Sequence, residues 1–201
     1  MDKYTIIDAI KYLKENSKKR NFIQSFDLIV TLKNIDTKKP ENKFSKDLIL
    51  PHGRGKDIKI CIISENGDIK RSDIEELGTN KKKAKELAKK YDFFVCEAPL
   101  MPLVGKILGK YLAPKNKMPK LLPPGKDLKS VIDEIKNTVR IRLRDSPTIQ
   151  VSVGTEKMED NQIRDNIEKV LEEIKKSLPQ KAQIKNIYIK LTMSKPVRIG
   201  V

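Results

Sequence analysis

The sequence predicts an α+β protein in which a small α/β domain is inserted into a split two-layer domain, an antiparallel sheet covered by two helices. Two observations predict this plan. Segments near both ends of the chain alternate apolar and polar residues with a period of two, which is typical of antiparallel strands with one buried face. Two segments in the middle are almost continuously apolar, which is typical of parallel strands buried on both faces.

The N-terminal part of the split domain begins with a helix and continues with a strand. Apolar residues recur at helical spacing between residues 6 and 13. In the segment 25–33, every second position is apolar: Phe26, Leu28, Val30 and Leu32. We therefore expect an amphipathic helix followed by a half-buried strand.

The middle of the chain predicts parallel strands separated and followed by helices. The apolar runs are residues 59–63 and 93–96, and the helical patterns are near 81–90, 99–111 and 127–137. Strands that alternate with helices in this way favour a parallel sheet.

The C-terminal part supplies three more strands and the second helix. The segments 139–144, 148–153 and 187–192 alternate apolar and polar residues. Between them, an apolar stripe repeats about every 3.6 residues, and its members are Ile163, Ile167, Val170, Leu171 and Ile174. This helix and the N-terminal one are expected to cover the buried face of the sheet.

The chain is thus predicted to form a discontinuous domain, residues 1–56 with 138–201, and an inserted domain, residues 57–137. The chain leaves the first domain through the Pro/Gly-containing segment 51–56 and returns near 137–138. Because only two thin connections join the domains, we expect a hinge there. The predicted hinge residues are His52, Gly53, Gly55 and Thr138.

The charge of the chain points to a nucleic-acid partner. The formal net charge is +16 over 201 residues, and the isoelectric point is near 9.7. Residues 98–126 contain six lysines, six prolines and no acidic side chain, although a solvated loop in a lysine-rich protein is the alternative. No apolar run approaches the roughly 20 residues of a membrane span. Cys61 and Cys96 lie in apolar runs, so we expect reduced core thiols and a cytoplasmic protein.

The sequence offers little for catalysis. His52 is the one histidine, and it lies in a turn. The segment 53–56 reads Gly-Arg-Gly-Lys, but Asp57 follows where a phosphate-binding P-loop needs Ser or Thr. We therefore predict no enzymatic activity, no cofactor and no metal site.

A row of arginines is a candidate RNA contact. Arg140, Arg142 and Arg144 alternate on one predicted strand and would lie near Lys190 and Thr192 if the strands that carry them pair. Guanidinium groups fit phosphates and guanine edges, and a solvated basic face is the alternative. The predicted helix within 156–176 carries seven carboxylates in that span, so we expect it to face away from RNA.

Several segments closely resemble the large-subunit ribosomal protein L-one family in its archaeal form. They occur in the family's order along nearly the whole chain, which makes chance agreement improbable. They are Arg20-Asn21-Phe22-Ile23-Gln24-Ser25-Phe26, Pro40-Glu41-Asn42, Leu50-Pro51-His52-Gly53-Arg54-Gly55-Lys56, Leu108-Gly109 through Met118-Pro119, and Tyr188-Ile189-Lys190-Leu191-Thr192-Met193. The resemblance implies that the inserted domain is Rossmann-like, with three layers.

The resemblance also implies a function. Members of the family bind large-subunit (23S-type) rRNA, form the mobile stalk beside the ribosomal exit site and help deacylated tRNA to leave. Many also bind their own operon mRNA and repress its translation. The implied partners are therefore this rRNA, exit-site tRNA, the chain's own mRNA and the large ribosomal subunit in the cytoplasm. The protein is expected to be a monomer when free and to have no membrane partner.

The candidate RNA contacts, taken from the resemblance and from the basic residues described above, form two groups. The main one lies in the split domain and includes the aromatic residue ahead of the first strand and the turn near the C-terminus: Arg20, Asn21, Phe22, Gln24, Ser25, Arg142, Arg144, Lys190, Thr192, Met193 and Ser194. A secondary group lies in the inserted domain: Lys115, Lys117 and Lys120. Without the resemblance, Phe22 and Met193 would be read as ordinary core residues.

The chain departs from the family's pattern at three places. Ser194 stands where the family usually has glycine, so the approach of the backbone to RNA is expected to differ. Ala113, Lys115 and Asn116 replace a Gly-Pro-Arg-Gly pattern, and the inserted domain is expected to have a reduced sheet. Two alternatives stay open: an RNA-binding translational regulator that acts outside the ribosome, and a nucleotide-dependent enzyme that uses the inserted domain.

Overall fold

The chain divides into two compact units. The computed structural model describes residues 4–56, 58–65, 67–115, 117–122, 128–179 and 181–200. The first unit contains residues 1–56 and 137–201, and the second contains residues 57–136. Asn137 belongs to the first unit, one residue earlier than the sequence indicates. Its backbone carbonyl accepts a hydrogen bond of 2.9 Å from the Leu50 N–H.

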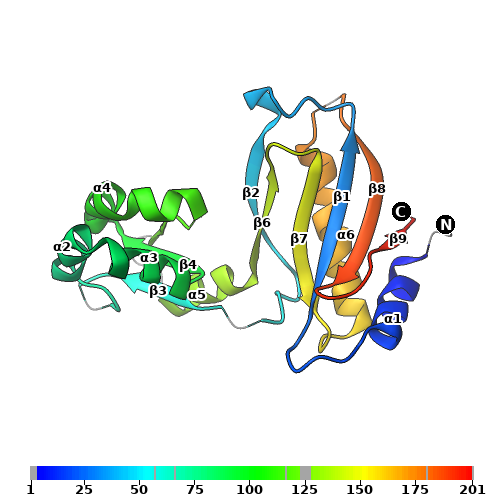
Figure 1. Ribbon diagram of the computed structural model, residues 1–201, viewed down its shortest axis with the longest axis horizontal. Helices are drawn as coiled ribbons and strands as arrows, with labels where there is room; N and C mark the ends of the chain where they lie inside the picture. The colour runs from blue at the N-terminus through cyan, green and yellow to red at the C-terminus, as the bar shows by residue number, and fades with distance from the viewer. Residues whose placement is uncertain are drawn as a thin grey trace. The chain divides into compact units, whose positions relative to one another are not determined.

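The first unit is built on a four-stranded antiparallel sheet (Figure 1). Its strands are β1 (Ser25–Lys33), β7 (Thr148–Thr155), β8 (Gln183–Leu191) and β9 (Val197–Ile199), in the order β7-β1-β8-β9. Along β1 the even-numbered residues from Phe26 to Leu32 are buried, and the odd-numbered residues are half-buried or exposed. The period-two pattern therefore predicted both the strand and its buried face.

A second ladder completes the β structure of this unit. It pairs β2 (Phe44–Ile49) with β6 (Thr138–Leu143) in antiparallel orientation. The arginines were expected near Lys190 and Thr192 only if the strands that carry them pair. That condition is not met, because β6 pairs with β2 whereas β8 pairs with β1 and β9. The sequence did not reveal β2 because its residues are half-buried or exposed without regular alternation.

Two helices cover one face of the four-stranded sheet, as predicted. They are α1 (Ile6–Asn16) and α6 (Asp160–Ser177), and Figure 1 shows α6 running behind the sheet. The Thr5 hydroxyl accepts the Asp8 N–H at 3.2 Å, which caps the first turn of α1. The apolar stripes of both helices join the buried strand residues in one core cluster, in which Phe26 and Ile167 are fully buried.

The second unit contains a parallel sheet of β3 (Ile60–Ile63), β4 (Phe93–Glu97) and β5 (Lys120–Leu122), in the order β3-β4-β5. Its helices are α2 (Arg71–Thr79), α3 (Lys81–Lys90), α4 (Met101–Leu112) and α5 (Leu128–Asn137). Short 3-10 turns are η1 (Pro40–Asn42) in the first unit and η2 (Ala98–Leu100) and η3 (Ala113–Lys115) in the second. Among the residues described, the sheet has three strands, as expected for a reduced sheet.

Three layers make up the second unit. Phe94 and Cys96 of β4 pack into a cluster with buried residues of α2, α3 and α4. Val95 points to the other face and packs with Val131 and Ile135 of α5. This arrangement confirms the predicted fold class, a split two-layer domain with an inserted Rossmann-like α/β domain.

Both cysteines are buried free thiols. Burial raises the pKa of Cys61 to about 12 and the pKa of Cys96 to about 11. Both therefore stay protonated near neutral pH and pack as core residues. Within the described ranges, no helix is long and apolar enough to cross a membrane. The same residues contain no group of three or more His, Cys, Asp or Glu suited to a metal ion.

Candidate RNA-binding surface

The segment ahead of β1 and the turn after β8 lie side by side. The Ser25 N–H donates to Thr192 Oγ1 at 3.1 Å, and the Thr192 N–H donates to the Ser25 carbonyl at 3.1 Å. This reciprocal pair extends the ladder between β1 and β8, in which Phe26 faces Leu191. Two of the predicted contact groups, far apart in sequence, therefore meet at one end of the sheet.

Gln24 holds this junction together from inside. The residue is only 1% exposed. Its Oε1 accepts the Met193 N–H at 3.2 Å, and its Nε2 donates to the Lys18 carbonyl at 3.4 Å. Its backbone N–H donates to Glu156 Oε1 at 3.0 Å. The sequence placed Gln24 among the RNA contacts, but its buried amide acts by positioning the turn that carries Met193.

Phe22 and Met193 are exposed on this junction. Phe22 is 50% exposed and Met193 is 60% exposed, and neither is a core residue. Ile23 is also exposed. Apolar side chains that stay in water near one another are a common mark of a binding surface. We call the group Arg20, Asn21, Phe22, Ser25, Thr192 and Met193 the Phe22–Met193 surface.

Ser194 closes the turn that follows β8. Its Oγ accepts the Leu191 N–H at 2.8 Å, and its backbone N–H donates to the Leu191 carbonyl at 3.0 Å. Among the described non-glycine residues, a positive φ occurs only at Asn34. The backbone at Ser194 thus does not need glycine, and the serine hydroxyl adds a bond that glycine could not make.

The charged candidates fall into two places. Arg20 and Asn21 are exposed on the Phe22–Met193 surface, and Lys190 lies opposite Asp27 in the β1–β8 register. Burial raises the pKa of Asp27, while Lys190 and Arg54 act in the opposite direction. Lys190 is thus one of two cations, with Arg54, that partly compensate the half-buried carboxylate of Asp27.

Arg142 and Arg144 lie on or beside the β2–β6 ladder. Burial, and then repulsion from Arg144 and Arg140, lower the pKa of the Arg142 guanidinium, which remains charged. Arg140 is occupied by Asp47, with Nε 2.7 Å from Oδ1. Strand pairing does not bring these arginines to Thr192, so they form a separate basic group.

The predicted hinge residues are tied to α6 by a residue that the sequence analysis missed. Asn166 is fully buried. Its Oδ1 accepts the His52 N–H at 3.2 Å, and its Nδ2 donates to the carbonyls of Gly53 at 2.9 Å and Val153 at 2.8 Å. A polar residue inside the apolar stripe of α6 was the signal that could have revealed it.

The rest of this connection is also bonded. His52 Nε2 lies 3.1 Å from Asp165 Oδ2, and Thr155 Oγ1 donates to the Gly55 carbonyl at 3.3 Å. Gly53 and Gly55 have φ of 66° and 63°, the left-handed conformation that glycine adopts without strain. Thr138 is buried and pairs with Ile49. All four predicted hinge residues are therefore held within the first unit.

The three lysines of the secondary group differ from one another. Lys115 is exposed, and Lys120 is half-buried in β5. Lys117 Nζ donates to the backbone carbonyls of Tyr91 at 2.7 Å and Ala88 at 3.2 Å. Two of the three N–H donors of Lys117 are therefore used at the end of α3. Asn116 and residues 123–127 of the lysine-rich segment lie outside the described residues.

Comparison with known proteins places the chain in a family. A model of the ribosomal protein L1p/L10e family matches residues 13–195, a span that includes both halves of the Phe22–Met193 surface. The chain belongs to this family. The large ribosomal subunit protein uL1 of Pyrococcus abyssi is 44% identical over 211 residues, which cover 98% of this chain and 96% of the relative.

Other archaeal members of the L1 family are equally similar. The uL1 protein of Methanocaldococcus jannaschii is 45% identical over 212 residues, covering 99% of this chain and 96% of the relative. That of Methanothermobacter thermautotrophicus is 42% identical over 207 residues, covering 96% of this chain and 98% of the relative. These findings confirm the resemblance to the archaeal form. The relatives are named as ribosomal proteins rather than enzymes, as the sequence predicted.

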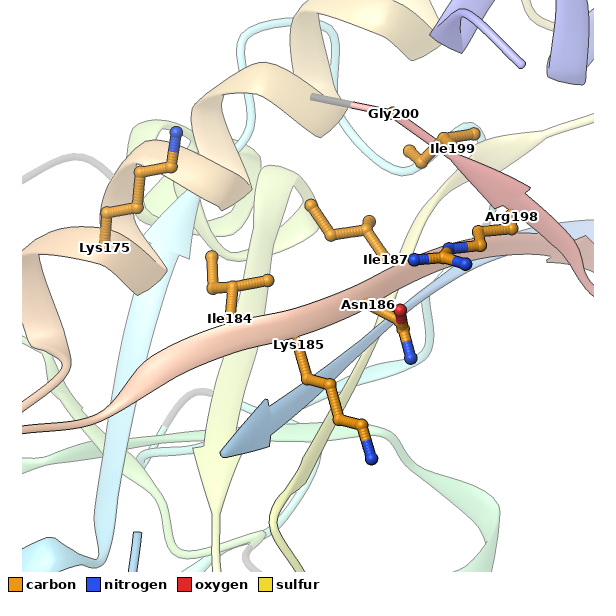
Figure 2. Close-up of a pocket in the computed structure, with 8 residues that line it drawn as sticks. All are labelled: Lys175, Ile184, Lys185, Asn186, Ile187, Arg198, Ile199 and Gly200. Atoms are coloured by element: carbon orange, nitrogen blue, oxygen red, sulfur yellow. The ribbon is translucent and has the colours of Figure 1, made fainter. Parts of the chain in front are cut away.

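A pocket in this L1-family chain lies away from the Phe22–Met193 surface. It has a volume of about 160 Å³ and lies at the edge where β9 ends beside β8 (Figure 2). In Figure 2, Ile184 and Ile187 lie on one side of β8, and Lys185 extends from the other. The lining residues are Lys175, Ile184, Lys185, Asn186, Ile187, Arg198, Ile199 and Gly200. No residue of the predicted RNA-contact groups lines this pocket.

Proposed function

We propose that this protein is a constituent of the large ribosomal subunit in the cytoplasm and binds large-subunit rRNA through the Phe22–Met193 surface. The observation that carries the proposal is the exposure of Phe22 and Met193 on a junction fixed by hydrogen bonds. Gln24 binds the Met193 N–H, and Ser25 and Thr192 bond reciprocally. Family membership and the names of the relatives support the same partner.

The chemistry of the surface suits structured RNA. Phe22 offers an aromatic face on which an unstacked base or a sugar can pack, and Met193 offers a second apolar contact. Thr192 Oγ1 accepts the Ser25 N–H, and the nearest acceptor for its own proton is the Ser25 carbonyl at 3.4 Å. Because that internal bond is long, the proton is available for a 2′-OH or phosphate oxygen.

The net charge of +16 adds an electrostatic contribution to the binding free energy that does not depend on RNA sequence. Lysines and arginines that neutralise phosphates release counterions, which favours binding at low salt. Arg20 on the Phe22–Met193 surface supplies one such charge directly. The proposed binding therefore combines a specific apolar and hydrogen-bonding contact with a general electrostatic attraction.

The more specific part of the proposal, the role of the protein in the ribosome and on mRNA, rests on the family resemblance. We infer that the protein forms the mobile stalk near the exit site, contacts tRNA there and assists the release of deacylated tRNA. We also infer that a folded segment of its own mRNA can occupy the same surface and that translation is then repressed. The first unit is the main RNA-binding domain in this proposal, and the free protein is a monomer.

A binding titration tests the proposal. The parent protein and Phe22→Ala are titrated with a large-subunit rRNA fragment and with an unrelated folded RNA of equal length. If about 6 to 10 phosphates are engaged, affinity falls about 10³- to 10⁵-fold between 50 and 200 mM salt. Phe22→Ala should weaken binding to the rRNA fragment by about 1–3 kcal/mol, the typical value for a base–aromatic stack.

The control for Phe22→Ala is Ile49→Ala, which removes another exposed apolar side chain, on β2. This control should leave affinity unchanged. Equal affinity of the parent protein for both RNAs would contradict the proposal. Co-sedimentation of the protein with large subunits separates a ribosomal constituent from a regulator that acts on mRNA alone.

A further inference from the structure

Charge is distributed unevenly along the second unit. Residues 57–76 contain three basic and six acidic side chains, whereas residues 81–120 contain eleven lysines and three acidic side chains. Six of those lysines lie in α3, whose sequence is KKKAKELAKK. The helix is thus the densest concentration of positive charge in this unit.

One side of α3 is buried and the other is cationic. Ala84 and Ala88 are buried against the core of the unit. Lys81, Lys82, Lys85 and Lys89 are exposed, and their spacings of three, four and seven residues place them on one side of the helix. They extend about 12 Å along the axis at about 1.5 Å per residue. We call these four residues the α3 lysine face.

Two of these lysines, Lys81 and Lys82, lie where positive charge opposes the stability of the helix, whereas Lys89 in the last turn is favourably placed. The N-terminal end of a helix carries partial positive charge, so Lys81 and Lys82 in the first turn are unfavourable there. Lys81, Lys85 and Lys89 also repel one another at intervals of four residues. Within the described part of the chain, the ion pair formed by an α3 lysine is that of Lys83 with Glu76, at 2.6 Å. Among the described residues, the four lysines of the face form no ion pair, and Glu86 is the one acidic residue of the helix, so an external polyanion would supply most of the compensating charge.

A second basic segment is attached to the end of this helix. The Lys117 ammonium bonds the carbonyls of Ala88 and Tyr91, which are left without helical partners at the C-terminus of α3. This contact holds Lys117 at the C-terminus of α3, and exposed Lys115 lies two positions before it in the chain. The lysine-rich segment therefore meets the helix at its C-terminal end.

We propose that the α3 lysine face binds the phosphate backbone of RNA without reading its sequence. The proposal rests on the proposed function in taking RNA as the partner, and it adds a second contact in the other unit. Lysine presents a point charge rather than the planar fork that reads base edges, so it binds phosphates without sequence information. An acidic protein is disfavoured because α3 exposes no apolar or aromatic side chain, whereas protein interfaces use such anchors at their centres.

A matched pair of triple variants tests the proposal. One carries Lys82→Gln, Lys85→Gln and Lys89→Gln. The control carries Lys38→Gln, Lys39→Gln and Lys181→Gln, which removes the same charge from exposed positions of the first unit. Glutamine keeps the helix propensity of lysine. Circular dichroism and thermal melting of both variants establish that they are folded.

Affinities for the rRNA fragment and for an unrelated RNA duplex are measured between 50 and 200 mM salt. The α3 triple should make the slope of log affinity against log salt shallower by about 2 to 3, because each phosphate contact contributes about 0.7 to 0.9. The preference for the rRNA fragment over the duplex should stay constant. The control triple should change the slope by less than about 1.

The outcomes separate this inference from the proposed function. If the two triple variants show equal slopes of log affinity against log salt, the proposal for the α3 lysine face is overturned. Specific binding of the rRNA fragment by the parent protein is not affected by that result. If the parent protein shows no preference for the rRNA fragment over the duplex, the proposed function is overturned. The salt dependence of duplex binding then still tests the α3 lysine face. Polyglutamate serves as the protein-like polyanion. If its binding falls in the α3 triple while both RNA slopes are unchanged, the face binds acidic protein and the proposal is overturned.

Discussion

Gln24 and Met193 are joined by a hydrogen bond of 3.2 Å, although 169 positions separate them in the chain. The bond runs from the backbone N–H of Met193, at the tip of the turn after β8, to the side-chain oxygen of Gln24, ahead of β1. It fixes an exposed residue through a buried one. A contact surface preorganised in this way loses less conformational entropy when it binds.

Replacing Gln24 by leucine, which has a similar size and no acceptor, should loosen this turn. We expect the Met193 N–H to exchange with solvent faster and the affinity for the rRNA fragment to fall by about 1–2 kcal/mol, a typical cost of one lost hydrogen bond. Amide exchange by NMR and a binding titration measure the two effects. An exchange rate at Met193 equal to that of the parent would remove Gln24 from this positioning role.

The Thr192 hydroxyl accepts the Ser25 N–H within the protein and is proposed to contact RNA as well. Thr192→Val removes the acceptor of the Ser25 N–H, so we expect a loss of about 1 kcal/mol in unfolding free energy. Binding should weaken by about 1–3 kcal/mol, because an RNA group is left unpaired. Thr192→Ser keeps the hydroxyl and should retain both properties. Similar binding by the valine and serine variants would show that RNA does not use the hydroxyl.

Asn166 should be among the most sensitive polar residues of the fold. Asn166→Ala leaves the His52 N–H and the carbonyls of Gly53 and Val153 without their partner in a buried place. We expect the unfolding free energy to fall by about 2–4 kcal/mol, from several unsatisfied groups. Urea denaturation measures the change. Glu168→Ala, at an exposed site on the same helix, is the control and should cost less than about 0.5 kcal/mol.

Asp27 should reduce stability as pH rises. Burial raises the pKa of this carboxyl above its ordinary value of 3.8, against the opposing charges of Lys190 and Arg54. The unfolded chain therefore releases this proton at lower pH than the folded chain. Folding stability is lost as pH rises from below 3.8 through the folded pKa. Asp27→Asn removes this loss, so its stability relative to the parent should increase between acidic and neutral pH.

Thermal melting at a series of pH values measures this difference. The control is Asp36→Asn, at an exposed position whose Oδ1 accepts the Lys38 N–H, a bond that asparagine can keep. The stability difference between Asp27→Asn and the parent must depend on pH more strongly than that of the control. Parallel curves would mean that burial of Asp27 has no net cost.

The periodic elements could be predicted from the sequence because each follows from one local pattern. Strands β1, β6, β7 and β8 alternate regularly, and α1 and α6 carry continuous apolar stripes. Strand β9 has three residues, too few for a period to be recognised, and β2 lacks a buried face. Their pairing is decided by neighbouring strands, and this is why the local pattern of β6 could not indicate that its partner is β2.

The candidate site was predictable in part. The resemblance indicated which residues belong to it, and the structure places Ser25 and Thr192 together. It could not indicate that Gln24 and Lys117 face inward, because burial of a long polar side chain depends on backbone groups from distant segments. Asn166 could have been noticed, since it lies three positions after Ile163 and four before Val170, at the spacing of the apolar stripe.

The insertion of the second unit between β2 and β6 determines the order in which the chain can fold during its synthesis. Strand β1 pairs with β7 and β8, and β2 pairs with β6, so every ladder of the first unit needs residues that follow the insertion. The second unit is complete at residue 136. At about 5–20 residues per second, the ribosome needs seconds more to add β6, β7 and β8. The second unit can therefore fold before the first, at a stage when β1 and β2 have no strand partners.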